Sequence, residues 1–314
     1  MLSYRFTRSL CMSRLMYRSV TTSVTYPPIL DGRPVAAQIR EDVAARVRLL
    51  RNAHGITPCL ATINCTGRED SGRYVRMKQE ACQSVGIKSI AFDFPPTIEE
   101  EFLASEVQSL SDRGDVNGII VQFPLPYEMD TALVLNSMDA TKDVDGLHPR
   151  NVAQQVLADR AAIFPCTPLA CMAMLEFYNI KVSGANIVII GSSNLVGKPL
   201  FHALLAREAT VTMCHAHTDT AMLQAHCLLA DIIVCAVGLP NFLPASFVRS
   251  GCTVLDVGIN VVDGKVVGDV QADDMRLKGC HVTPVPNGIG PLTIGMLLHN
   301  TVRCTEMQIS KDWL

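Results

Sequence analysis

Two patterns of hydrophobic and polar residues alternate along the chain. Short runs rich in β-branched residues occur at 60–65, 118–121, 186–190, 210–213, 231–234 and 253–257. Longer segments with apolar residues at helical spacing separate them, at 35–50, 74–85, 98–111, 168–178 and 196–206. Strands that alternate with helices predict parallel sheets covered by helices, and therefore an α/β protein.

The alternation is interrupted near the middle of the chain. A Pro-rich stretch at 122–126 and a turn-rich stretch at 143–151 follow one another there. We therefore expect two α/β lobes with a boundary near residue 149, the second being a Rossmann-like, doubly wound parallel sheet.

Composition narrows the class of protein further. The chain has 314 residues, of which 48% are hydrophobic and 18% charged, and its 20 Gly and 17 Pro are too few for a collagen-like or disordered chain. The net charge of −3 argues against nucleic acid as a partner, and no apolar run is long enough to predict a membrane span. The 12 cysteines are scattered without zinc-ligand spacing, so we expect no metal and no disulfide framework, with Cys214 and Cys235 as small core residues.

The first 26 residues differ from the rest of the chain. They contain Arg5, Arg8, Arg14 and Arg18 and many Ser and Thr, but no acidic residue. This composition is typical of a mitochondrial presequence and predicts a matrix location, an unstructured terminus being the simpler alternative.

A strand-to-helix turn in the second lobe has the small residues of a dinucleotide site. The buried-strand candidate 185–190 is followed by Gly191, Ser192, Ser193, Val196 and Gly197, and then by a helix. Such a turn lets the backbone approach a pyrophosphate at a helix N-terminus, although its spacing only partly matches G-x-G-x-x-G. Further residues at strand ends extend the predicted coenzyme site: His215, Ala216, Val237, Gly238, Gly258 and Ile259.

The residues after the strand 210–213 bear on which coenzyme binds. An NAD site usually has a carboxylate at this point to bind the ribose hydroxyls. Here the strand leads into His215, Ala216 and His217, and Lys198 and Arg207 could also meet a 2′-phosphate. We therefore expect NADP, with NAD possible.

Residues suited to proton transfer lie in the first lobe. Tyr74 and Lys78 are four residues apart and share one helical face, where a ring and an amine could flank a planar substrate. Gln122 ends a hydrophobic strand, and Asp145 lies in the turn between the lobes. Each also has a simpler interpretation. Tyr74 and Lys78 could lie on a solvated helix face, Gln122 could be a capped loop amide, and Asp145 could only form the turn.

Taken together, these motifs closely resemble the bifunctional methylenetetrahydrofolate dehydrogenase/methenyltetrahydrofolate cyclohydrolase family. The stretches that carry the resemblance are 71–78, 118–126, 142–149, 165–168, 191–199, 256–260 and 283–293. The resemblance implies a folate-binding catalytic domain at 27–148, completed by a C-terminal helix at 290–314, and an NAD(P)-binding domain at 149–289. It also implies a homodimer formed through the coenzyme lobes.

The resemblance implies roles for individual residues. Lys78 matches the catalytic lysine, Tyr74 the ring that stacks on the folate, Gln122 the amide that tunes the lysine, and Asp145 the carboxylate that binds the pterin. Pro286, Gly290 and Pro291 fall in the stretch that completes the folate site. The implied activity is oxidation of 5,10-methylenetetrahydrofolate with NADP, followed by hydrolysis of the methenyl cation to 10-formyltetrahydrofolate.

Several positions depart from the family pattern, among them Phe123 and Leu169-Ala170, which replace Leu and Lys-Gly without a catalytic consequence. Ser192 and Ala216 replace the Arg and Ser that often help to hold a 2′-phosphate, and Asn287 stands where Gly is usual, although Asn tolerates a left-handed backbone. Two alternatives remain: a dehydrogenase without cyclohydrolase activity, and a nucleotide-binding regulator without catalysis. A dehydrogenase of small hydroxy acids is less favoured, because no His–Asp pair stands at the strand ends.

Overall fold

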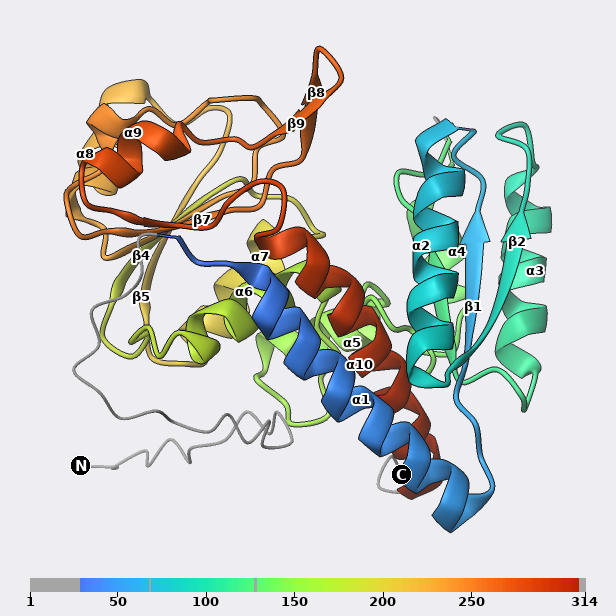
Figure 1. The fold of residues 1–314 in the computed structure, drawn as a ribbon. Coiled ribbons are helices and arrows are strands. Elements are labelled where there is room, and N and C mark those ends of the chain that lie inside the picture. Colours follow the sequence, from blue (N-terminus) through green and yellow to red (C-terminus); the bar gives the residue numbers. More distant parts are fainter. Residues whose placement is uncertain (1–28, 68, 127–128, 311–314) are drawn as a thin grey trace, which may run out of the picture.

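The computed structural model describes residues 29–67, 69–126 and 129–310, without the side chains of 69–74. The predicted presequence, residues 1–26, lies outside this part of the chain. Two α/β lobes stand side by side, joined by long helices that run beneath both (Figure 1).

The first lobe has a three-stranded parallel sheet in the order β2-β1-β3. Its strands are β1 (Cys59–Asn64), β2 (Lys88–Asp93) and β3 (Gly118–Val121), and its helices are α2 (Glu69–Val85), α3 (Glu100–Asp112) and α4 (Thr131–Asn136). Every residue of β1 and β3 is buried, whereas β2 alternates between exposed and half-buried positions. β1 is therefore the central strand, and β3 delivers its carboxyl end to the side facing the other lobe.

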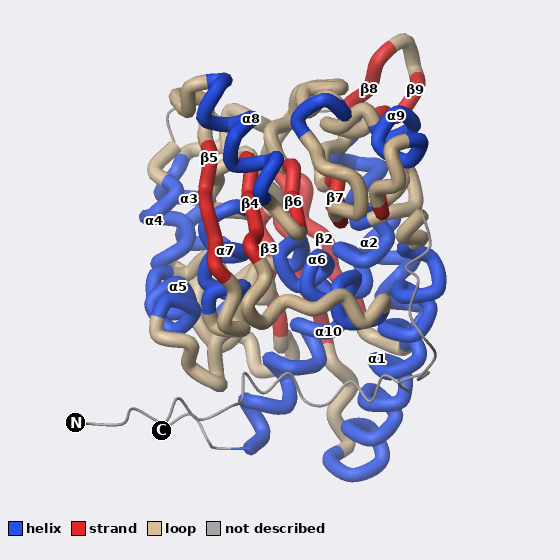
Figure 2. The backbone as a smooth tube through the Cα atoms, turned by 90° about the vertical axis from the view of Figure 1, so that its left-hand side faces the viewer, coloured by secondary structure: helices blue, strands red, loops and turns tan. Residues whose placement is uncertain are grey.

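The second lobe has five parallel strands in the order β10-β7-β6-β4-β5. They are β4 (Asn186–Ile190), β5 (Thr210–Cys214), β6 (Ile232–Cys235), β7 (Thr253–Asp256) and β10 (His281–Val282). Alternate residues of β4 belong to different cores: Ile187 and Ile189 to one, Val188 and Ile190 to the other. Helices α6 (Cys166–Phe177) and α7 (Gly197–Leu205) cover one face, and α8 (Thr220–Leu229) and α9 (Ala272–Leu277) cover the other (Figures 1 and 2). This is the predicted doubly wound sheet.

Two long helices connect the lobes. α1 (Gly32–His54) and α10 (Ile289–Ser310) lie against each other, and α10 also packs on α6 (Figure 1). Gly32 permits their close approach at one end, since a Cβ there would overlap the Gly288 carbonyl oxygen. Near the other end Arg46 donates from Nε and Nη2 to the Glu306 carboxylate, at 2.9 and 2.7 Å.

The predicted strands and helices are present. Apart from α1 and α2, their ends lie within a few residues of the predicted ones. α1 extends the predicted segment 35–50 at both ends, and α2 starts five residues before the predicted 74. Periodicity missed β2, α4, α5 (Pro149–Val156), α8, α9, β10, and the hairpin of β8 (Asn260–Val262) and β9 (Lys265–Val267). All cysteines that the structure describes are buried, and none of these is paired, so Cys214 and Cys235 are core residues as predicted.

Candidate active site

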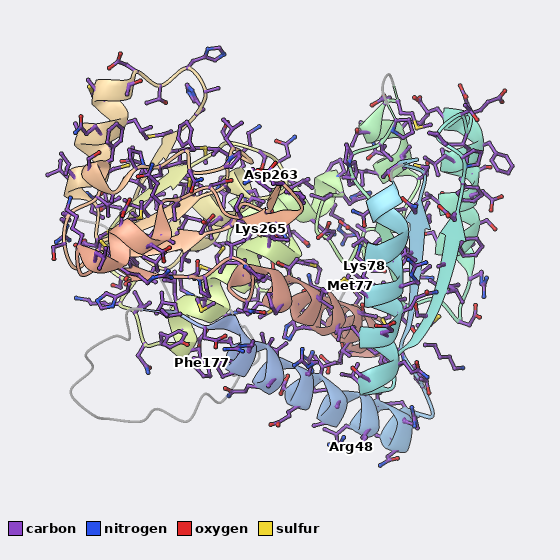
Figure 3. All side chains as sticks on the ribbon, turned by 45° about the horizontal axis from the view of Figure 1, so that its top comes forward. Arg48, Met77, Lys78, Phe177, Asp263 and Lys265 are labelled. Atoms are coloured by element: carbon purple, nitrogen blue, oxygen red, sulfur yellow. The ribbon has the colours of Figure 1, made fainter. Side chains whose placement is uncertain are left out.

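The amine of Lys78 is the centre of the site in the first lobe. Lys78 lies on α2, the helix on the side of this lobe that is turned toward the coenzyme lobe (Figure 3). Its Nζ donates to Gln122 Oε1 at 2.7 Å. Burial lowers the pKa of Lys78 below its usual value, while the charge of Asp145 works in the opposite direction. The lysine and the glutamine therefore meet as predicted, in surroundings that favour a neutral amine.

Gln122 is held by the end of β3. Its backbone N–H donates to the Ile63 carbonyl at 2.8 Å, and its Nε2 donates to the Phe123 carbonyl at 3.2 Å. With the amide nitrogen engaged in this way, Oε1 is left to accept from Lys78. The sequence motif of a polar residue directly after a buried strand thus fixes the orientation of the amide.

Asp145 lies in a turn shaped by a second carboxylate, Asp143. Asp143 accepts from the backbone N–H of Asp145 at 3.2 Å and of His148 at 2.7 Å, and from Asn151 Nδ2 at 2.8 Å. Burial raises the pKa of Asp143 to about 6 despite these donors. The Asp145 carboxylate accepts from the backbone N–H of Cys166 at 3.2 Å, at the start of α6. Asp143 is therefore structural, and Asp145 is the carboxylate whose charge reaches Lys78.

Asn300 on α10 is a further supporting residue, which motif reading missed. Its Nδ2 donates to the carbonyls of Val144 at 2.7 Å and Phe164 at 2.9 Å, and the side chain is fully buried. Val144 immediately precedes Asp145, so α10 fixes the turn that carries this carboxylate. Asn300 is 156 and 136 residues away from these partners in the sequence, and a motif search therefore does not find it.

The remaining predicted folate residues lie on two elements. Tyr74 is within α2, but its side chain is outside the described residues. Pro286 precedes α10, and Gly290 and Pro291 are in its first turn. A Cβ on Gly290 would lie 3.7 Å from Cδ1 of Ile259, a predicted coenzyme residue. The predicted folate and coenzyme residues thus adjoin at this point.

Asn287 adopts a left-handed backbone in the turn before α10. Its φ is +77°, and its carbonyl accepts from the Gly32 N–H at 2.8 Å. Asn is among the residues that adopt this conformation with least strain. The turn therefore survives the replacement of glycine, as predicted.

The glycine turn after β4 fits a dinucleotide. Gly191 has φ +117°, and a Cβ on it would overlap the Ala236 carbonyl oxygen; a Cβ on Gly197 would overlap that of Gly191. Gly197 begins α7, and its N-cap Val196 makes no side-chain cap. The Lys198 N–H donates to the Ser193 carbonyl at 3.1 Å and Pro199 has no N–H, so the Gly197 N–H is the first-turn group that can serve an anion. Ser193 Oγ accepts from the Val196 N–H at 3.1 Å and shapes the loop. Strand, glycines and helix start are thus placed to receive a pyrophosphate.

The loop after β5 begins with two histidines, and its one carboxylate is at its far end. His215, Ala216 and His217 are exposed, and the N–H of His217 donates to His215 Nδ1 at 3.2 Å. Lys198 is close to the glycine turn, with its Nζ donating to Asn194 Oδ1 at 2.7 Å. Residues 215–218 carry no acidic group to repel a 2′-phosphate, and the Asp219 carboxylate that follows accepts from the N–H groups of Ala221 and Met222 as the N-cap of α8.

The ends of β6 and β7 carry the other predicted coenzyme residues: Val237, Gly238, Gly258 and Ile259. Two buried acids accept from the backbone N–H groups of three of these residues: Asp269 from Val237 and Gly238, and Asp256 from Gly258. The sequence did not reveal this role of the two acids. In the described residues no helix is long and apolar enough to span a bilayer. In the same part of the chain, no group of three or more His, Cys, Asp or Glu side chains is arranged to bind a metal ion.

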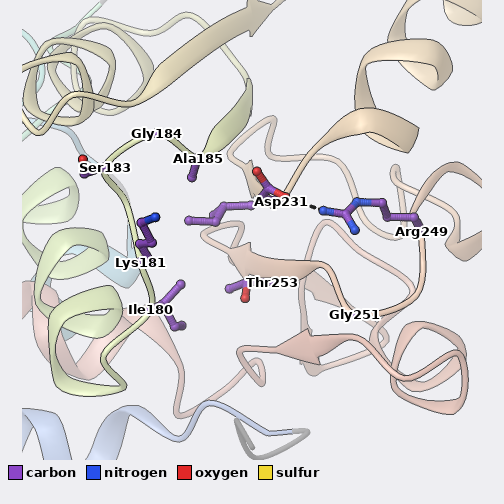
Figure 4. A pocket seen from close by; sticks show the side chains of 10 residues that line it. Ile180, Lys181, Ser183, Gly184, Ala185, Asp231, Arg249, Gly251 and Thr253 are labelled. Atoms are coloured by element: carbon purple, nitrogen blue, oxygen red, sulfur yellow. Dashed lines mark hydrogen bonds and ion pairs between the residues drawn. The ribbon is translucent and has the colours of Figure 1, made fainter. Parts of the chain in front are cut away.

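A groove of about 300 Å³ lies at the other end of the coenzyme sheet. It is lined by residues at the starts of β4, β6 and β7, among them Ala185, Ile232 and Thr253, with an Asp231–Arg249 ion pair at its edge (Figure 4). None of the predicted site residues lines it.

The two lobes define a nucleotide-dependent α/β enzyme in which the lobe opposite the coenzyme site carries a half-buried lysine. The family model described as the catalytic domain of tetrahydrofolate dehydrogenase/cyclohydrolase matches residues 30–145, and that of its NAD(P)-binding domain matches residues 165–309. The chain belongs to the tetrahydrofolate dehydrogenase/cyclohydrolase family.

Individual relatives agree along nearly their whole length. The bifunctional protein FolD of Nautilia profundicola is 41% identical over 279 residues, 88% of this chain and 97% of the relative. The crystal structure of the Campylobacter jejuni bifunctional enzyme FolD is 40% identical, with a TM-score of 0.86 over 90% of this chain and 99% of that one. The Trypanosoma brucei dehydrogenase-cyclohydrolase, solved with NADP and an inhibitor, is 34% identical, with a TM-score of 0.85 over 90% and 98%.

Proposed function

We propose that this chain oxidises 5,10-methylenetetrahydrofolate with NADP and hydrolyses the resulting methenyl cation to 10-formyltetrahydrofolate. The observation that carries the proposal is the half-buried Lys78 amine, bonded to Gln122 and close enough to Asp145 to be affected by its charge. Family membership supports the two activities, and the closeness of Gly290 to Ile259 supports a folate site beside the coenzyme site.

Each residue has a chemical part in the reaction. Lys78 in its neutral form takes a proton from the water that attacks the methenyl carbon, because burial lowers the pKa of its ammonium. The bond between that carbon and N5 then breaks as N5 takes up a proton, which leaves the formyl group on N10. Gln122 Oε1 orients the lysine by accepting from Nζ. Asp145 offers an anionic acceptor to the N–H edge of the pterin, and its charge favours a cationic folate.

The coenzyme, when bound, accepts the hydride from the methylene carbon. Around it the chain supplies position: Gly191, Gly197 and the start of α7 would hold the pyrophosphate, and residues after β6 and β7 would hold the reacting ring. The preference for NADP is supported by the loop at His215–Ala216–His217, where no carboxylate opposes a 2′-phosphate.

Initial rates test the proposal directly. The purified protein is given methylenetetrahydrofolate with NADP or NAD, and reduced coenzyme and the methenyl absorbance band are followed together. Methenyltetrahydrofolate supplied alone tests hydrolysis. We expect reduction of NADP faster than of NAD, with little methenyl accumulation. Accumulating methenyl product would indicate a dehydrogenase without cyclohydrolase, and absent turnover with both coenzymes a regulator.

We further propose that the enzyme is a homodimer of the mitochondrial matrix. An Arg-rich, acid-free segment precedes residue 30, where the family match begins, which supports import and cleavage. Val261, 71% exposed on the hairpin of β8 and β9, offers the coenzyme lobe an apolar surface for a second copy. A native N-terminus at Met1 would refute cleavage, and a monomer mass in sedimentation would refute the dimer.

A further inference from the structure

Asp269 connects the two loops at the far end of the coenzyme site. This carboxylate is completely buried. Its Oδ2 accepts from the backbone N–H groups of Val237 at 2.7 Å and Gly238 at 2.9 Å, after β6. Its Oδ1 accepts from Asn260 Nδ2 at 2.9 Å, after β7. One side chain therefore sets the spacing of both loops.

A second acid, Asp256, lies directly beside Asp269. It accepts from the backbone N–H groups of Gly258 at 3.2 Å, Asp269 at 2.9 Å and Val270 at 3.2 Å. Burial raises the pKa of Asp256 to about 6, and the Asp269 charge adds to that rise. The two loops are packed closely on these acids, since a Cβ on Gly258 would overlap the Asp269 carboxylate.

Neither acid has a cationic partner among the described residues. Asp256 and Asp269 take part in none of the ion pairs of that part of the chain, and their partners above are neutral backbone and amide groups. The neutral donors offset part of the cost of burying these carboxylates, and a cation brought close by a ligand would offset more of it.

The loops on Asp269 are those that must hold the reacting ring. Ile259, between Gly258 and Asn260, adjoins Gly290 of the predicted folate residues. Hydride transfer requires the ring and the folate to meet, so the ring belongs at this end. An oxidised nicotinamide ring carries a positive charge that the reduced ring lacks.

We propose that Asp269 is a positioning residue for the nicotinamide ring and that its charge makes the site bind oxidised coenzyme more tightly than reduced coenzyme. This inference rests on the proposed function, because it requires a dinucleotide in this lobe. NADP+ and NADPH have the same phosphates and adenosine, so their affinity ratio isolates the ring.

The test is calorimetric titration of wild type and Asp269→Asn with NADP+ and with NADPH. Asparagine has nearly the same shape as aspartate. Its oxygen can accept from the N–H groups of Val237 and Gly238, and its NH2 can donate to the oxygen of Asn260 once that amide has flipped. We expect the Kd for NADP+ to rise about tenfold and that for NADPH to change less than about twofold, because only the oxidised ring carries a charge that the carboxylate attracts. Asp263→Asn, an exposed acid in the β8–β9 turn, is the matched control and should change neither Kd.

Urea unfolding followed by circular dichroism shows whether the coenzyme lobe of Asp269→Asn is folded, and methenyl hydrolysis without coenzyme reports the other lobe, where Lys78 lies. A folded variant that loses both affinities equally, or neither, overturns the proposal. Should the variant not fold, the wild type decides: NADP+ must bind more tightly than NADPH, and the reverse order refutes the charge effect. A wild type that binds neither coenzyme refutes the proposed function as well.

Discussion

Replacing Lys78 by Met removes the amine and keeps a stem of similar length. The folded protein loses one hydrogen bond to Gln122, worth about 1–3 kcal/mol for a charged donor, and is relieved of the cost of burying an ammonium. The two effects oppose each other, so we expect the free energy of unfolding to stay within about 1 kcal/mol of wild type. The hydrolysis rate, which needs the amine as a base, should fall by about 10²- to 10⁴-fold.

The assay follows decay of methenyltetrahydrofolate absorbance across a pH series, with urea unfolding on the same preparations. Wild-type hydrolysis should increase with pH and level off below the usual lysine pKa, because burial lowers the pKa of Lys78 and the neutral amine is the active form. The variant should lose this dependence. Lys88→Met, at an exposed position of β2, is the matched control and should behave as wild type. Hydrolysis by Lys78→Met at near the wild-type rate, with the same pH profile, would show that another group is the base.

Three further substitutions test the surroundings of this amine. Asp145→Asn should raise the KM for folate by removing the anionic acceptor while the fold persists, and an unchanged KM would refute that contact. Asp143, with a folded-state pKa raised to about 6 from 3.8, contributes stability that is complete below pH 3.8 and lost as the pH rises through 6. In urea unfolding, the free energy of unfolding of Asp143→Asn should therefore differ from that of wild type by about 3 kcal/mol less at pH 7 than at pH 4. A difference that is the same at both pH values would contradict burial as the cause of the raised pKa. Asn300→Leu leaves the Val144 and Phe164 carbonyls unpaired, which should lower the free energy of unfolding by about 2–4 kcal/mol; a loss under about 0.5 kcal/mol would show that neither bond matters.

Those parts of the site that depend on local chemistry were predictable from the sequence. Gln122 follows a buried strand, and Gly191 and Gly197 bracket a strand-to-helix turn, so neighbouring residues determine where each lies. The amphipathic segment around Lys78 likewise predicts α2. Strong apolar runs such as β3 and β4 were located at their observed bounds.

Features that depend on distant contacts were not predictable. β2 is exposed or half-buried throughout and therefore lacks the apolar run of a core strand. Asp269 bonds to residues 31 and 32 positions away, and Asn300 to residues more than a hundred positions away. In each case the role of a polar side chain depends on a partner that only the folded structure brings close, and no rule of sequence spacing predicts such a partner.

The position of α10 has a consequence for the synthesis of the protein. This helix follows every strand in the chain, yet it packs on α1, the first helix, and fixes the turn before Asp145. During translation the apolar surface of α1 stays uncovered until the ribosome has made almost the whole polypeptide, because its partner α10 is synthesised last. Nascent chains are thus exposed to aggregation for most of elongation, and prematurely terminated ones would be targets for chaperones and proteases.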